Sequence, residues 1–88
     1  MTQTSLKSKF IFNPEDWKTP EENKSTVFSI TILTKEHVGG DSPIIQKYHK
    51  ESEQRYTLNN EFICVNNQGD VTLIAPSLPE YVIKIVIM

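Results

Sequence analysis

The chain has 88 residues, a length that suits one small domain with a core of modest size. Its net charge of −2 argues against a nucleic-acid or anionic-membrane surface dominated by charge, and its 38% hydrophobic residues are ordinary for a globular protein. The single cysteine, Cys64, excludes an internal disulfide and a cysteine-based zinc site, which fits a reducing compartment.

The whole of residues 1–88 is expected to form one domain, with the polar residues 1–8 frayed. No apolar run approaches the ~18–20 residues that span a bilayer, and no secretory signal is recognised. These observations predict a cytoplasmic protein that does not contact a membrane.

Residues 9–12 predict a short strand that ends at Asn13-Pro14. Asn13 and Thr19 are each followed by a proline and acidic residues, the pattern of a helix start. Because no amphipathic run follows either one, we expect single helical turns. Trp17 lies between them and is expected to close one end of the core.

Residues 26–34 alternate clearly between apolar and polar side chains. Phe28, Ile30 and Ile32 would lie on one face, with Ser29 and Thr31 on the other. This alternation predicts a strand that is buried on one face.

Residues 43–53 are predicted to form a helix. Ser42-Pro43 suits a helix start, and the segment is rich in good helix formers such as Gln, Lys and Glu. Its apolar stripe, Ile44, Ile45 and Tyr48, is narrow. The alternative is a polar hairpin that turns at Glu51-Ser52.

From Tyr56 onward the pattern predicts strands alone. Residues 62–65 and 71–75 are the first two, separated by a turn over residues 66–70. Residues 76–79, rich in proline, form a rigid connection to a last strand over residues 81–88.

The order strand, strand, helix, strand, strand, strand predicts an α+β fold. We expect a single, mostly antiparallel sheet of four to five strands with one short helix packed on it. The alternative is a small all-β barrel or sandwich.

The last strand is the most informative segment, because it is apolar on both faces. Its Tyr81, Ile83, Ile85 and Ile87 would point one way, and Val82, Lys84, Val86 and Met88 the other. Leaving the three apolar residues of the second set in water would forfeit roughly 5–9 kcal/mol. The second face is therefore either covered within the molecule or in contact with another molecule.

No catalytic, metal or cofactor residue is predicted. The turn at Gly39-Gly40-Asp41, with His37 before it, lacks the spacing of a phosphate-binding loop. No spacing places His37 and His49 on one helical face for a metal, and Cys64 between apolar neighbours is expected to be a buried or half-buried hydrophobe.

Basic and aromatic residues alternate over residues 46–56, the mixture that binds single-stranded nucleic acid. This segment gives the alternative function, a small nucleic-acid-binding module. Glu51 and Glu53 cancel much of its positive field, so nucleic acid is not the expected partner.

The sequence thus predicts a small intracellular protein without enzymatic activity that binds another protein, as an adaptor, inhibitor or assembly partner. The protein is also expected to self-associate through its sheet, as a homodimer. The residues expected to contact the partner are Val82, Lys84, Val86, Met88, Tyr48, Arg55 and Tyr56.

Overall fold

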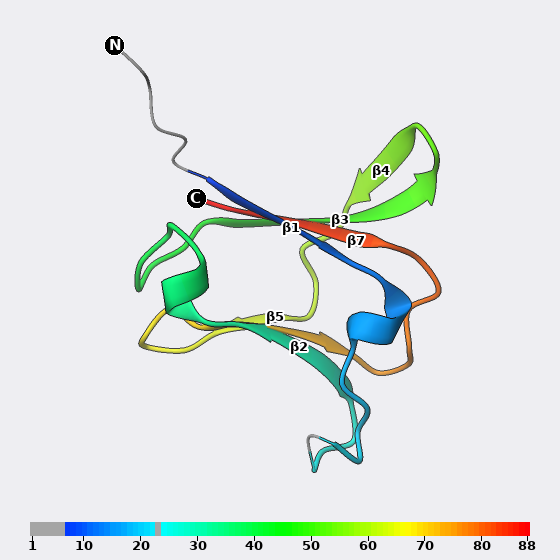
Figure 1. The fold of residues 1–88 in the computed structure, drawn as a ribbon, viewed down its shortest axis with the longest axis horizontal. Helices are drawn as coiled ribbons and strands as arrows, with labels where there is room; N and C mark the ends of the chain where they lie inside the picture. The colour runs from blue at the N-terminus through cyan, green and yellow to red at the C-terminus, as the bar shows by residue number, and fades with distance from the viewer. Residues whose placement is uncertain (1–6, 23) are drawn as a thin grey trace.

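The computed structural model, which describes residues 7–22 and 24–88, contains two antiparallel sheets packed face to face (Figure 1). Sheet A has four strands in the order β1 (Ser8–Phe12), β7 (Ile83–Ile87), β3 (Ile45–Ser52) and β4 (Arg55–Leu58). Sheet B has three strands in the order β2 (Phe28–Ile32), β6 (Val71–Ala75) and β5 (Ile63–Val65). Two short 3-10 turns, η1 (Pro14–Asp16) and η2 (Thr34–Glu36), accompany them.

The expectation of an α+β fold with a helix packed on one sheet is wrong. The described residues contain no helix longer than a 3-10 turn, and the layer that covers sheet A is a second sheet. The molecule is therefore a mostly β sandwich, which was the alternative expectation from the sequence.

The error arises at residues 43–53, because Ile45–Ser52 form strand β3 rather than a helix. Ile45 lies opposite Ile87 of β7 and Tyr48 lies opposite Lys84. Helix propensities differ by only a few tenths of a kcal/mol among such residues, so pairing with a buried strand overrides them. The segment forms a hairpin with β4, and its turn lies between Ser52 and Arg55.

One core lies between the sheets, and alternate residues of the central strands build it. Val71, Leu73, Ile85 and Ile87 are fully buried. Trp17 belongs to the same cluster and is 5% exposed, as its position between two turns predicted. This alternation is the usual way in which two packed sheets share a core.

At one end of the sandwich, hydrogen bonds connect the loop that follows β2 with the turn between β5 and β6. Thr34, which begins η2, donates both its backbone N–H and its hydroxyl to Asp70 Oδ1, at 2.8 and 2.9 Å. His37 Nε2 lies 2.7 Å from the carbonyl oxygen of Gly69, and the Gly39 N–H donates to His37 Nδ1 at 3.0 Å. Because Nδ1 accepts, Nε2 carries the proton and donates to Gly69.

The other predicted elements are found close to their expected positions. The alternating segment at residues 26–34 forms β2, and residues 71–75 form β6. Asn13 precedes η1, whereas Thr19 begins a turn that its side chain closes by accepting the Glu22 N–H at 3.2 Å. Residues 1–6 of the segment expected to fray lie outside the described residues, and Ser8 already belongs to β1.

Neither of the helical turns in the described part of the chain has the length or the apolar character that crossing a membrane requires.

Candidate functional site

The strand register brings one set of side chains together on the side of sheet A that faces away from sheet B. Ile83, Ile85 and Ile87 of β7 point into the core, so the alternate residues point outward. One outward row crosses all four strands as Ile11, Lys84, Tyr48 and Leu58. The next row contains Lys9, Val86 and Gln46.

Both ends of this surface continue the same alternation. Ile44 and Met88 exchange two backbone hydrogen bonds of 2.9 Å, which extends the pairing of β3 with β7 by one position. At the opposite end Lys50 lies opposite Tyr56, and the Lys50 N–H donates to the Val82 carbonyl. We call this whole surface, from Ile44 and Met88 to Val82 and Tyr56, the outer face of sheet A.

The outer face of sheet A is largely apolar and accessible. Ile44, Leu58 and Ile11 expose between 50% and 64% of their surface, and Met88 exposes 41%. Val86 lies half-buried between them. Single exposed apolar residues are common, but a contiguous apolar patch is characteristic of a binding surface.

The outer face of sheet B is different. Its alternate positions are occupied by Ser29, Thr31, Thr72, Cys64 and Ile74. The hydroxyl oxygens of Thr31 and Thr72 lie 3.3 Å apart, within hydrogen-bond distance. The sandwich therefore has one mostly polar and one mostly apolar outer face.

Lys84 lies at the centre of the outer face of sheet A. Its ammonium nitrogen is 4.3 Å from the ring centroid of Tyr56 and 4.9 Å from that of Tyr48, close enough for a cation–π interaction with each ring. Among the described residues, no carboxylate lies within ion-pair distance of Lys84. The Lys84 ammonium group is thus positioned by the two aromatic rings, and no described carboxylate neutralises its charge.

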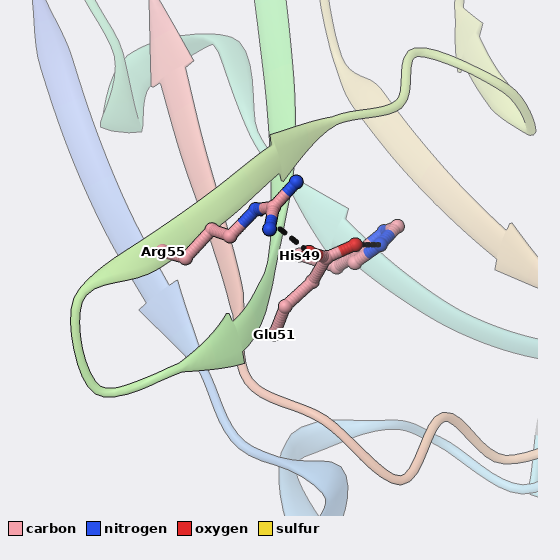
Figure 2. A network of polar contacts seen from close by, with 3 residues as sticks. All are labelled: His49, Glu51 and Arg55. Atoms are coloured by element: carbon pink, nitrogen blue, oxygen red, sulfur yellow. Dashed lines mark ion pairs between the residues drawn. The ribbon is translucent and has the colours of Figure 1, made fainter.

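A polar network occupies the other side of the β3–β4 hairpin (Figure 2). Glu51 carboxylate oxygens lie 3.2 Å from Arg55 Nε and 3.7 Å from His49 Nε2. A hydrogen bond from Thr57 lowers the pKa of Glu51, and the charges of Arg55 and His49 lower it further. This network stabilises the ionised carboxylate and fixes the end of the hairpin.

The structure brings most of the predicted partner-binding residues together. Six of them lie on the outer face of sheet A: Val82, Lys84, Val86, Met88, Tyr48 and Tyr56. Arg55 does not, because it precedes the outward-pointing Tyr56 and pairs with Glu51 on the opposite side. Their role in binding stays a prediction.

The predicted set did not include six members of the face: the apolar Ile11, Ile44 and Leu58, and the polar Lys9, Gln46 and Lys50. Ile11 lies between Phe10 and Phe12, and this run of apolar residues already indicated a strand with no polar face. No comparable signal marked Leu58, which joins the patch only because β4 pairs with β3.

The remaining sequence candidates have structural roles or lie apart. Both ring nitrogens of His37 are used in the loop contacts described above. Within residues 7–22 and 24–88, no three His, Cys, Asp or Glu residues are grouped so that they could hold a metal. The expectation that Cys64 is buried or half-buried is wrong: Cys64 is exposed, because it points outward from the edge strand β5, opposite Thr72.

A groove of about 440 Å³ opens beside the 76–81 segment, and Lys47, Asn59, Phe62 and Tyr81 are among its lining residues. Burial lowers the pKa of Lys47, and the nearby Glu61 carboxylate opposes this shift. Lys47 nevertheless has a clear structural role. Its ammonium donates to the Glu61 carbonyl, its N–H donates to Asn60 Oδ1 at 2.8 Å, and its carbonyl accepts the Asn59 N–H at 2.7 Å.

The ammonium contact gives the buried lysine a partner, and together with the two backbone contacts it fixes the loop at residues 59–61. The ammonium group is thus engaged by the Glu61 carbonyl. The outer face of sheet A is therefore the stronger candidate site.

Comparison with known proteins does not identify the chain, since no family model, no curated protein and no solved structure matches it.

Proposed function

We propose that this chain is a small cytoplasmic protein without enzymatic activity, and that it acts by binding another protein through the outer face of sheet A. The observation that supports this proposal is the difference between the two outer faces. The outer face of sheet B carries Ser29, Thr31 and Thr72 beside Cys64 and Ile74, whereas sheet A exposes at least half of each of Ile11, Ile44 and Leu58.

The composition of the outer face of sheet A suits a protein partner. Its aliphatic residues surround Tyr48 and Tyr56, and tyrosine is enriched where proteins contact one another. Covering a leucine or isoleucine side chain that now faces water stabilises a complex by about 25 cal/mol per Å² of apolar area, before the costs of association. A flat sheet surface offers such area without any enclosed pocket.

Site-specific photo-cross-linking tests this proposal. A photoreactive phenylalanine analogue replaces Leu58, which is 53% exposed on β4, an edge strand of the face. In cells that produce the protein, irradiation is expected to give discrete protein adducts, because the analogue would lie inside the interface. Adding the substitution Ile11→Ser should weaken these adducts by shrinking the apolar area.

The matched control carries the same analogue at Thr31, which is exposed on sheet B. Adducts of equal intensity from positions 58 and 31 would mean that cross-linking reflects random encounters, and the proposal would then be wrong. Thermal unfolding of each variant checks that the fold is intact.

The nucleic-acid alternative retains one supporting observation, the closeness of Lys84 to Tyr48 and Tyr56. Aromatic rings bind single strands by stacking on bases. Lys84 lies over both rings and competes with a base for these positions. Binding of a fluorescent single-stranded oligonucleotide that falls steeply with salt would favour this alternative.

A further inference from the structure

The charged residues on the outer face of sheet A all have the same sign. Lys9, Lys50 and Lys84 belong to it, and none of the described Asp and Glu residues does. The chain as a whole has 11 acidic and 9 basic residues, so the positive charge of this face is opposite in sign to the net charge of the chain.

Two of these lysines have no acidic partner within the described residues. Lys50 is paired with Glu53, at 3.6 Å, beside the hairpin turn. Lys84 has only the aromatic rings, and no ion pair is made by Lys9. A partner that covered these ammonium groups without neutralising them would pay a large desolvation cost.

We propose that the partner of this face is an acidic segment of another protein. Its carboxylates pair with Lys84 and Lys9, while its apolar side chains pack on Ile11, Val86 and Leu58. This inference rests on the proposed function and specifies the chemistry of the partner.

The register suggests the spacing of the acidic groups. Lys9 lies opposite Val86, and Lys84 lies opposite Ile11, so the two lysines are diagonal neighbours on adjacent strands. Diagonal positions on an antiparallel pair are about 7–8 Å apart. An extended segment places every second side chain about 7 Å apart on one side. The Lys84 ammonium lies over Tyr48 and Tyr56, on the side of β7 away from Lys9, so the acidic groups that meet both lysines must be spaced more widely than these backbone positions.

A second copy of the chain fits this face less well. Stacking two outer faces would bring the lysines of both copies into one apolar interface that contains no described carboxylate. Nucleic acid would supply phosphates, but it has no counterpart for the exposed aliphatic side chains of Ile11, Ile44, Leu58 and Met88.

Peptide display tests the inference with the full chain as target. A library of short random peptides on phage is selected against the immobilised protein. We expect enrichment of peptides that combine Asp or Glu with large apolar residues. Their affinities are then measured by fluorescence anisotropy at about 0.05 M and about 0.5 M salt, where screening differs strongly.

The decisive variant is the double substitution Lys9→Glu with Lys84→Glu. It should weaken binding of the enriched peptides by about tenfold or more, since two attractive contacts become repulsive. The matched control is Lys18→Glu with Lys35→Glu, which changes the net charge equally at exposed positions elsewhere. The control should bind like the wild-type protein, and both variants should retain wild-type thermal unfolding.

The outcomes separate this inference from the proposed function. Enriched peptides that lack acidic residues, lose affinity in Leu58→Ser and tolerate both charge variants would overturn the inference and leave the proposed function standing. Failure to enrich any peptide that depends on Leu58 would count against both. Light scattering that shows a dimer dissociated by Leu58→Ser would assign the face to a second copy, and oligonucleotide binding lost in the Lys9 and Lys84 variant would assign it to nucleic acid.

Discussion

Asp70 connects the turn between β5 and β6 to the loop that leaves β2. One carboxylate oxygen accepts two hydrogen bonds from Thr34, and the other accepts one from the Asn66 side chain at 3.0 Å. The Asn66 hydrogen bond lowers the pKa of Asp70, and the Thr34 hydrogen bonds lower it further. The sequence indicated a turn at residues 66–70, but not that Thr34 would meet it, because the two are far apart in the chain.

Acid should weaken the fold through Asp70. Its pKa is lower in the folded chain than the ordinary value of 3.8, so the unfolded chain takes up the proton first as the pH falls. The stabilisation is complete well above pH 3.8 and is lost as the pH falls below that value towards the folded pKa. Urea unfolding of the wild type and Asp70→Asn over this range should show the difference in unfolding free energy shrinking. If the difference in unfolding free energy between the two proteins stayed constant as the pH falls, Asp70 would not be the cause of the loss of stability in acid.

For strand β7, the sequence predicted which side chains are buried but not which strands lie beside it. Its alternation was readable because each face of a strand takes every second residue, and Ile83, Ile85 and Ile87 are buried on one side as expected. Tyr81, which was expected on the same side, precedes β7 and is 40% exposed. The strands that pair with β7 could not be predicted from its alternation. Lys84 meets Tyr48 through pairing between distant segments, and the helix-forming composition of residues 43–53 concealed that pairing.

Substitutions at neighbouring positions of β7 should differ in cost. Ile85→Ala removes a fully buried side chain and should lower the free energy of unfolding by about 2–5 kcal/mol. Val86→Ala, on the half-buried outer side, should cost about 1 kcal/mol or less. Urea unfolding measures both values. Equal losses would show that both sides of β7 are covered to the same extent in the isolated chain.

The molecule as a whole depends on a close approach between the connections of its two sheets. Gly69, in the turn of sheet B, has φ of +89°, and a Cβ atom there would lie 2.1 Å from the Gly40 carbonyl oxygen. Gly40, in the connection to β3, has φ of +63° but open space around it. The glycines marked turns in the sequence, but nothing in the sequence showed that these two turns meet.

Replacing Gly40 or Gly69 by alanine should distinguish the cost of backbone strain from the cost of a steric clash. Gly40→Ala should cost about 1–2 kcal/mol, the penalty for a side chain at positive φ. Gly69→Ala adds a collision with backbone and should cost about 3 kcal/mol or more. Thermal or urea unfolding of the two variants tests this order. Similar losses would indicate that the two loops can move apart at little cost.

Cys64 and the outer face of sheet A lie on opposite sides of the sandwich. Cys64 is the only cysteine of the chain and points away from sheet A, next to Thr72. Thiol chemistry can therefore attach the protein to a sensor chip in a single orientation. Ile11, Tyr48 and Leu58 would then be turned towards the flowing analyte, and a dye on the same sulfur would leave them unobstructed.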